Sequence, residues 1–379
     1  MSSNRTLGLA LAALFLVPSL AVFAQAKEPV VIGVGGPLTG PQAQYGLAWK
    51  KGFDLALEEI NASGGIQGRP LALDFEDTQN IPAQTVAVAQ KFIADPKILL
   101  ATGDFSSTSS MAASPLYQRA GLVQFGFNNS NPAFTNGGDF VWSNSPTQTS
   151  EAPAHAAYVK ALGLKKVALF QLNSDWGKVT GDLTAAALTK LGISIVVTEA
   201  YLPDNQDFKP LITKAKAAGV DGIVLVSYEN DAALIVQQVR GQGIKVPIVA
   251  NGSNATAGFL KLAGGSAEGV YVAGDFAGDD PRPEVQVFAK KWKAKYNEGL
   301  DYFAVHAYDS LKVAAAALNA SKLDRTSVKD AFAKIKDVPS VIYGKVTFNA
   351  ATRRVDDFLG ARLVVKAGQL IAWNGKVNS

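Results

Sequence analysis

Two clusters of small polar residues follow apolar segments of the sequence, and their residue types suit the binding of an anion. The first is GDFSSTSS at 103–110, where Ser106 and Ser107 stand at the start of a helical pattern that ends near Gly121. A helix N-terminus offers free amides and a partial positive charge, which suit a carboxylate. The second cluster is NNSNP at 128–132. Simple N-capping explains the serines equally well when they are taken alone, but together the clusters predict a carboxylate cradle.

Two aromatic residues occupy similar positions later in the chain. Trp176 lies in QLNSDWG (171–177) and Tyr228 in LVSYEND (225–231), each just after an apolar segment. Aromatic residues at helical spacing usually belong to a core, whereas these stand in loop-like surroundings at expected strand ends. We therefore expect them to form one wall of a ligand cleft. A third such segment ends in VANGSN (249–254), which supplies only small polar residues.

The glycine-rich segment VVIGVGGPLTG at 30–40 does not match a phosphate-binding loop. A dinucleotide fingerprint requires a third glycine where this chain has Leu38. A P-loop requires Gly-Lys-Ser or Gly-Lys-Thr, but Gly40 is followed by Pro41. The segment is therefore expected to be a tight turn from strand to helix, in which glycine permits close backbone approach.

Catalytic chemistry has little support in the sequence. The chain contains no Cys, which excludes thiol nucleophiles, Cys-based zinc sites and disulfides, and it has no HExxH or GxSxG motif. Its two histidines, His155 and His306, lie in helical patterns, as packed or surface residues usually do. We expect a binding protein with no catalytic residue, metal or cofactor. An exported α/β hydrolase is the alternative from the enzyme class.

The N-terminus has the composition of a secretory signal peptide. Residues 1–26 combine Arg5, an apolar stretch from Leu7 to Leu20 and a final Ala-Gln-Ala, which predicts cleavage after Ala26 and export. Removal of these 26 residues from 379 leaves 353, a length that suggests two domains. The net charge of +4, without a basic block that contains aromatics, gives no indication of a nucleic acid partner.

Short apolar segments alternate with helical patterns, which predicts an α/β fold of two doubly wound parallel-sheet lobes. A polar, proline-containing join at 143–153 separates the two blocks. Residues 282–336 read as two or three helices, and the chain ends with a strand at 345–349 and a strand pair at 361–373. The other expected strands are 30–34, 71–75, 98–103, 122–127, 166–172, 194–201, 222–228 and 246–251.

The chain resembles the Leu/Ile/Val-binding protein family, the periplasmic solute receptors of ABC importers. The segments that carry the likeness are VVIGVGGPLTGPQAQYG (30–46), EEINASGGIQGRPL (58–71), FSSTSS (105–110), NNSNP (128–132) and DWG (175–177). The resemblance covers nearly the whole mature sequence and implies a clamshell of two lobes joined by three crossovers. It implies a first lobe at 27–145 plus 275–350 and a second lobe at 146–274 plus 351–379.

The resemblance also implies a set of ligand contacts. Ser107, with the backbone of Phe105, corresponds to the carboxylate anchor of the family. Asn128 and Ser130 fall where the family uses backbone groups and a hydroxyl, and Tyr45 is expected to wall the pocket. The expected ligand-binding residues are Tyr45, Phe105, Ser106, Ser107, Asn128, Ser130, Trp176, Tyr228 and Gly252.

One position departs from the family pattern. Amino acid receptors of this family typically carry an acidic residue after the strand VPIVAN, where it pairs with the ligand ammonium, and the aligned residue here is Gly252. A buried ammonium without a counter-charge costs on the order of several kcal/mol. Either Asp104 or Glu229 replaces the missing acid, or the ligand has no amino group. Together with Trp176, the missing acid favours an amine-free acid, aromatic or 2-oxo, over a branched-chain amino acid.

The function implied by the resemblance is that of a periplasmic solute-binding protein. It would close on a small carboxylate and deliver it to the membrane permease of an ABC importer, and we expect it to be a monomer. An exported sensor of amides or urea is the alternative among binding proteins.

Overall fold

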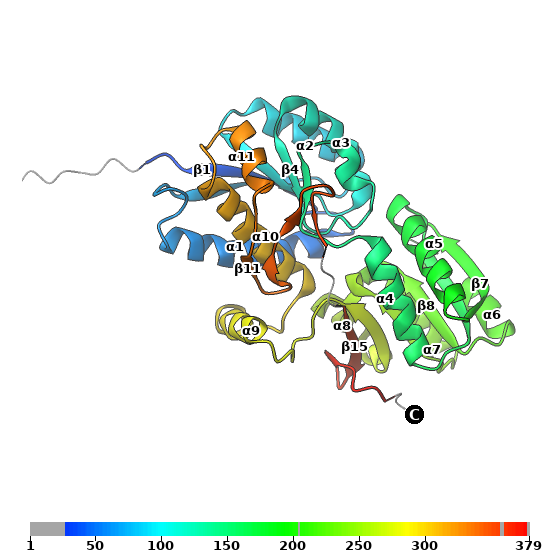
Figure 1. The fold of residues 1–379 in the computed structure, drawn as a ribbon. Coiled ribbons are helices and arrows are strands. Elements are labelled where there is room, and N and C mark those ends of the chain that lie inside the picture. The colour runs from blue at the N-terminus through cyan, green and yellow to red at the C-terminus, as the bar shows by residue number, and fades with distance from the viewer. Residues whose placement is uncertain (1–26, 204, 357–359, 377–379) are drawn as a thin grey trace, which may run out of the picture.

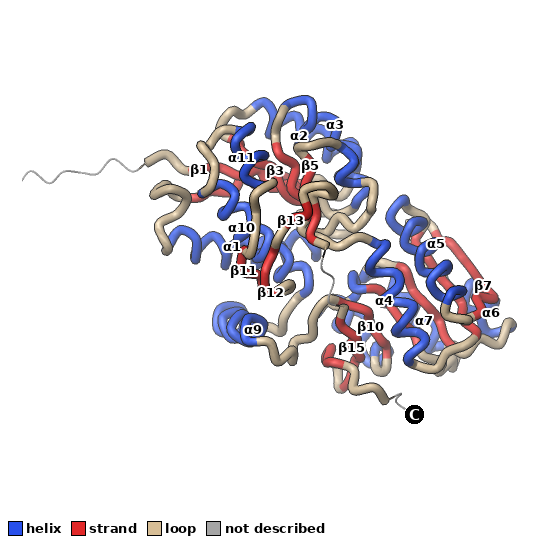
Figure 2. The backbone as a smooth tube through the Cα atoms, viewed as in Figure 1, coloured by secondary structure: helices blue, strands red, loops and turns tan. Residues whose placement is uncertain are grey.

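The computed structural model describes residues 27–203, 205–356 and 360–376. They form two lobes (Figure 1), and the predicted signal peptide lies outside the described residues. In each lobe the strands make a central sheet with helices against it (Figure 2). Within the described ranges, no helix has the length and apolar character needed to cross a bilayer.

The first sheet has seven strands in the order β13-β14-β5-β4-β3-β1-β2. All neighbours pair in parallel except β13 and β14, which are antiparallel. A small hairpin of β11 (Val338–Ser340) and β12 (Gly344–Val346) lies outside this sheet. The strands of the sheet are β1 Val30–Gly36, β2 Leu71–Asp77, β3 Ile98–Gly103, β4 Val123–Gly126, β5 Val141–Ser143, β13 Phe348–Asn349 and β14 Arg354–Val355.

Helices cover both faces of the first sheet. The apolar face of α1 packs on the sheet, where Tyr45, Trp49, Phe53 and Ile60 are buried in the core and Leu57 is partly buried against it. That core also includes side chains of α9, α10 and α11, whereas α2 and α3 form a second core on the opposite face. The helices are α1 Ala43–Ala62, α2 Pro82–Ala94, α3 Ser107–Ala120, α9 Pro283–Tyr296, α10 Tyr302–Asn319 and α11 Arg325–Phe332.

The second sheet also has seven strands, in the order β16-β15-β10-β9-β8-β6-β7. Its strands are β6 Lys166–Leu172, β7 Ser194–Tyr201, β8 Gly222–Val226, β9 Ile248–Asn251, β10 Val270–Gly274, β15 Ala361–Lys366 and β16 Gln369–Ala372. The first five are parallel, and the last two add antiparallel strands at one edge. The helices are α4 Gln148–Ala161 and α5 Asp175–Lys190 on one face, and α6 Lys209–Ala217, α7 Glu229–Gly241 and α8 Ala257–Ala263 on the other.

The five parallel strands follow the same spatial order in both lobes. They run β2-β1-β3-β4-β5 in the first sheet and β7-β6-β8-β9-β10 in the second. In such sheets a ligand crevice opens at the carboxyl ends of the two strands between which the order reverses. These strands are β1 and β3 in one lobe and β6 and β8 in the other. The polar cluster at 103–110 follows β3, and Trp176 and Tyr228 follow β6 and β8.

The predicted fold class is confirmed, since the chain passes between the sheets three times, after β5, β10 and β14. The lobe limits stay a prediction, but one of them conflicts with the strand pairing. A second lobe that resumes at residue 351 would include β14, yet Arg354 pairs with Ser143 of β5 in the first sheet. The strands β5 and β10 were not among those expected from the sequence, and the helix expected around His155 begins within the join at 143–153, as α4.

The glycine-rich end of β1 permits close packing at the cleft edge. Gly103 has φ +109°, and a Cβ there would lie 2.0 Å from the carbonyl oxygen of Gly35. The next amide, of Asp104, donates to that same oxygen at 2.7 Å. In α1, a Cβ at Gly46 would lie 2.0 Å from the carbonyl oxygen of Pro37. The glycines therefore bring the end of β3 and the start of α1 against the first turn.

Candidate functional site

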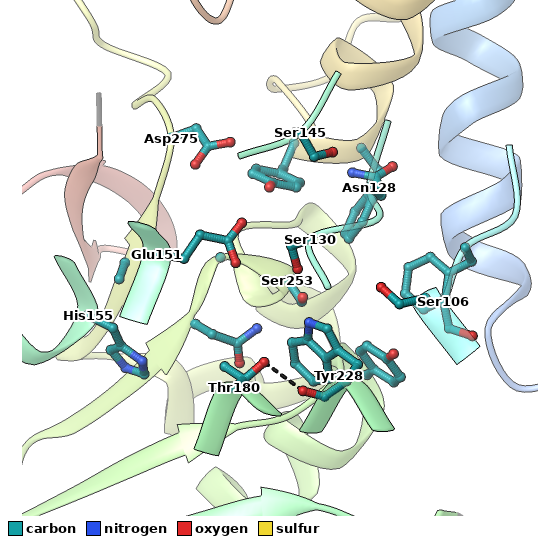
Figure 3. Close-up of a pocket in the computed structure, with 18 of the residues that line it drawn as sticks. Ser106, Asn128, Ser130, Ser145, Glu151, His155, Thr180, Tyr228, Ser253 and Asp275 are labelled. Carbon is teal, nitrogen blue, oxygen red and sulfur yellow. Dashed lines mark hydrogen bonds between the residues drawn. The ribbon is translucent and has the colours of Figure 1, made fainter. Parts of the chain in front are cut away.

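A cavity lies between the lobes, at the carboxyl ends of both sets of strands (Figure 3). About 790 Å³ of space lies among its lining residues, including open solvent at the mouth. Eight of the nine predicted contact residues line it, although their contact with a ligand stays a prediction. They are Phe105, Ser106, Ser107, Asn128 and Ser130 from the first lobe, and Trp176, Tyr228 and Gly252 from the second.

Tyr45 does not line the cavity, contrary to the expectation that it walls the pocket. Its ring is buried and stacks on Phe105, with ring centroids 4.1 Å apart and planes inclined by 12°. Its hydroxyl accepts a hydrogen bond at 2.7 Å from the amide of Glu229 in the second lobe. Nearby, the side-chain amide of Asn230 donates to the carbonyl of Pro41 at 2.8 Å. The start of α1 therefore supports the cavity wall and contacts the other lobe directly.

The N-terminus of α3 forms the polar end of the first-lobe wall. Ser106 is the N-cap, and its Oγ accepts a hydrogen bond from the amide of Ser109 at 3.2 Å. The Oγ of Ser107 accepts one from the amide of Asn131 at 3.3 Å, so its hydroxyl proton remains available to a ligand. The amides of Ser107 and Thr108 have no intrahelical acceptor because they open the helix. This arrangement can bind a carboxylate.

The loop at 128–131 is held in place from behind. The side-chain amide of Asn129 donates to the carbonyl of Asp104 at 3.1 Å, which ties the loop to the start of α3. The guanidinium of Arg354, which is 2% exposed, donates to the carbonyls of Asn129 at 2.8 Å and Asn131 at 2.6 Å. Sequence patterns did not single out Arg354, because it lies in a segment expected to belong to the second lobe.

Aromatic rings form the second-lobe wall. Trp176 lies in the first turn of α5, and Tyr228 is the N-cap residue of α7. Their rings stack at a centroid distance of 4.9 Å with 17° between the planes. The ring of Tyr228 also lies 5.0 Å from that of Phe105, so aromatic contact spans the two lobes.

Neither acid that was expected to replace the missing ammonium partner lines the cavity. Asp104 is buried within the first lobe at φ +60°, and burial raises its pKa to about 8. Glu229 is also buried, and its carboxylate accepts a hydrogen bond from the hydroxyl of Thr256. Burial raises the pKa of Glu229 to about 7.

Two other acids line the cavity, and the sequence patterns missed both. Glu151 lies in the first turn of α4, and Asp275 follows the last residue of β10. Burial and then the charge of Asp275 raise the pKa of Glu151 to about 8, while Arg354 acts in the opposite sense. Asp275 Oδ2 lies 3.0 Å from Nε2 of the buried His306. The strand at 270–274 was not predicted; its prediction would have placed Asp275 at the carboxyl end of a strand, where ligands bind.

His155 also lines the cavity, one turn after Glu151 on α4. Its Nε2 donates to the carbonyl of Val249 at 3.2 Å, and burial lowers its pKa to about 4, so the ring is neutral at pH 7. Within the described ranges, no group of three His, Asp or Glu side chains can hold a metal ion. The cavity is thus built to hold a solute through amides, hydroxyls, aromatic rings and two carboxyls.

Comparison with known proteins agrees with this geometry. The periplasmic binding protein family matches residues 29–361. An amino acid binding protein of Pseudomonas aeruginosa is 30% identical over 88% of this chain and 90% of its own length. A Leu/Ile/Val-binding protein homolog of Brucella suis is 28% identical over 83% of each chain.

A solved structure extends the comparison to the fold. The branched-chain amino acid transporter substrate binding protein LivJ of Streptococcus pneumoniae, in complex with isoleucine, superposes with a TM-score of 0.83. It is 28% identical, and the match covers 90% of this chain and 98% of LivJ. The expected resemblance is confirmed: the chain belongs to the periplasmic binding protein family, whose members bind solutes rather than catalyse reactions, and its relatives include Leu/Ile/Val-binding proteins.

Proposed function

We propose that this protein is the solute-binding component of an ABC importer and that it binds a small carboxylate in the cavity between its lobes. The closed form would deliver the solute to a membrane permease, and the protein would act in the periplasm as a monomer. The names of its relatives support this proposal, since they include an amino acid binding protein and a complex with isoleucine.

The observation that carries the proposal is the position of the α3 N-terminus at an inter-lobe cavity. Ser107 and the first amides of α3 offer donors to an anion from the first lobe, while Trp176 and Tyr228 offer apolar surface from the second. A solute that contacts both walls binds the closed arrangement more tightly than the open one. It therefore shifts the population toward closure.

A thermal-shift screen of the mature protein tests this function. The panel contains amino acids, aromatic acids, 2-oxo acids, amides and urea. A solute at about 100 times its Kd adds about 2.7 kcal/mol to the free energy of unfolding, which raises the melting temperature by several degrees. Isothermal titration calorimetry then gives the stoichiometry, expected to be one per chain. The proposal is contradicted if no member of the panel raises the melting temperature.

An amine-free aromatic acid is the second candidate ligand. The observation that favours it is the stacked pair of Trp176 and Tyr228, which contributes aromatic surface to the cavity lining. Benzoate and 3-phenylpropanoate in the same screen separate this candidate from branched-chain amino acids. An amide or urea that binds more tightly than every acid would favour the sensor alternative.

A further inference from the structure

We infer that Glu151 and Asp275 form a subsite for a cationic group of the ligand, so that the cavity selects amino acids over the matching amine-free acids. The inference rests on the proposed function and assigns the substrate class of the same cavity. It reverses the expectation drawn from Gly252, because the counter-charge comes from α4 and from the end of β10 rather than from the end of β9.

The charge balance of the cavity is the first step. Two of the described residues that line it are carboxylic acids, and none is Lys or Arg. The guanidinium of Arg354 is buried and donates to the carbonyls of Asn129, Asn131 and Ser145 and to the hydroxyl of Ser143. Its hydrogen bonds are therefore made to the protein. His155 is neutral at pH 7 and bound to the carbonyl of Val249.

Unpartnered polar atoms in the cavity are the second, independent step. Ser145 is 3% exposed and lines the cavity, and its Oγ has no hydrogen-bond partner within the described ranges. The same holds for Oδ1 of Asn128, a buried acceptor atom. Buried polar atoms are nearly always paired in native proteins, so these point to a bound group. An ammonium, with three donors, matches carboxylate, amide and hydroxyl acceptors.

The coupling between the acids is the third step. Burial and then the charge of Asp275 raise the pKa of Glu151, and burial together with the charges of Asp275 and Glu151 raises the pKa of the neighbouring phenols of Tyr302 and Tyr343. Arg354 opposes the shift at Glu151, and His306 pairs with Asp275. A negative charge on Asp275 therefore disfavours the ionised form of the neighbouring Glu151. A ligand cation placed beside them removes this penalty, whereas an amine-free acid offers no positive charge to offset it.

The carboxylate subsite belongs to the first lobe, whereas Glu151 of the cation subsite belongs to the second. The donors for the ligand carboxylate lie at α3 and the loop after β4 in the first lobe, while Glu151 lies on α4 of the second and Asp275 at the crossover after β10. Figure 3 shows Ser106 and the Glu151 carboxylate on opposite sides of Ser130. A zwitterion therefore contacts both halves of the molecule, and the contact of its cationic end with Glu151 stabilises the closed arrangement.

Matched ligand pairs test the inference by calorimetry at pH 7. The pairs are L-leucine with 4-methylpentanoate and L-phenylalanine with 3-phenylpropanoate, which differ only in the amino group. We expect the amino acid to bind at least about 30-fold more tightly in the pair that fits the cavity, as for a buried charge pair. Glu151→Gln should reduce this ratio to less than about 5-fold by weakening the amino acid alone. Glu229→Gln, which changes a buried acid outside the cavity, should leave the ratio unchanged.

The number of protons released on ligand binding distinguishes direct contact of Glu151 with the ligand from a merely structural role. Because the pKa of Glu151 is about 8 in the free protein, binding of an ammonium at pH 7 should release about one proton. Titrations in buffers of different ionisation enthalpy should show this release for the amino acid and none for its amine-free partner. The wild-type ratio and proton count need no variant, so the test stands even if Glu151→Gln fails to fold.

The outcomes separate the two proposals. Equal affinity for both members of a bound pair, with no proton release, overturns the cation subsite and leaves the solute-binding function intact. Selectivity that persists in Glu151→Gln also overturns it. If neither member of any pair nor any solute of the screen binds, the proposed function itself fails, and the cation subsite with it.

Discussion

The two walls of the cavity differ in the charge of the groups that they present to a ligand. The anion side, made of residues 105–107 and 128–130, presents neutral donors on a scaffold that hydrogen bonds hold in place: Ser106 caps α3, and Asn129 and Arg354 hold the loop. The acid side presents the carboxyls of Glu151 and Asp275, and burial together with the charge of Asp275 raises the pKa of Glu151. One wall is organised before a ligand arrives, whereas the other acquires its missing counter-charge from the ligand.

This difference indicates that the two sides act at different stages of lobe closure. A neutral donor site binds a carboxylate in an open first lobe, because its amides are fixed by α3 and need no partner from the second lobe. The acid side contributes favourable binding free energy only when a cation reaches it, which requires the lobes to approach each other. Changes on the anion side should therefore abolish binding of all acids, and changes on the acid side should alter selectivity and closure.

The largest effect is expected from Ser107→Asp. A carboxylate at the first position of α3 occupies the free amides and repels the ligand carboxylate, so the Kd for the best solute of the screen should rise at least about 100-fold, or ~2.7 kcal/mol. The melting temperature should stay the same or fall slightly, because an acid is favourable at a helix N-terminus but Ser107 is only 1% exposed. Calorimetry and thermal melts of the same sample measure both.

Thr108→Asp is the matched control for this change. It adds the same charge one residue later in the same helical turn, but Thr108 does not line the cavity. We expect a loss of less than about 5-fold, from the change in long-range field alone. Equal losses in both variants would show that the anion does not bind at Ser107.

The anion side was predictable from sequence, and the acid side was not, for a physical reason. Ser107 and Asn128 follow strands whose apolar β-branched runs mark them as buried, and ligands bind at the carboxyl ends of such strands. Glu151 lies instead on α4, in a proline-containing segment expected to be a crossover. Asp275 follows β10, which was not expected as a strand. Only the three-dimensional path of the crossovers brings these acids to the cavity.

Trp176→Ala should produce the second largest effect and shows whether apolar contact acts on both ligand classes alike. Loss of the indole removes a ring that stacks on Tyr228 and lines the cavity. We expect affinity to fall about 30-fold, or ~2 kcal/mol, for amino acid and amine-free partner equally. The control is Trp373→Ala, since Trp373 packs on Tyr158 and does not line the cavity. A change in the ratio between the pair would mean that Trp176 contributes to recognition of the amino group.

Asp104→Asn tests whether a buried acid outside the cavity affects stability without affecting selectivity. The pKa of Asp104 is raised from 3.8 to about 8 in the folded protein, so the folded state holds a proton that the unfolded state has lost. The free energy of unfolding of the wild type should therefore fall as pH rises from about 4 to 8. Asparagine removes this dependence and tolerates the positive φ. Urea titrations should show equal stability near pH 4 and a variant more stable by about 1 kcal/mol or more at pH 8.

The ligand-pair ratio is the second readout for Asp104→Asn. It should match the wild type, in contrast to the fall expected for Glu151→Gln. If the affinity ratio falls in both variants, the selectivity depends on the burial of an acid and not on its position in the cavity.

The smallest effect is expected from Tyr45→Phe, which decides between two roles for this residue. Its hydroxyl is the acceptor for the Glu229 amide across the lobes, and the variant leaves that buried donor unpaired in the closed form. The Kd should rise about 3- to 10-fold through faster dissociation, and equally for both members of a ligand pair. Tyr296→Phe removes a comparable hydroxyl, which donates to the carbonyl of Lys51 within the first lobe, and should leave the Kd unchanged. A rise beyond about 100-fold in Tyr45→Phe exceeds what one neutral hydrogen bond supplies. It would restore Tyr45 to the cavity wall, as the sequence predicts, and would mean that the lobes close further around the ligand.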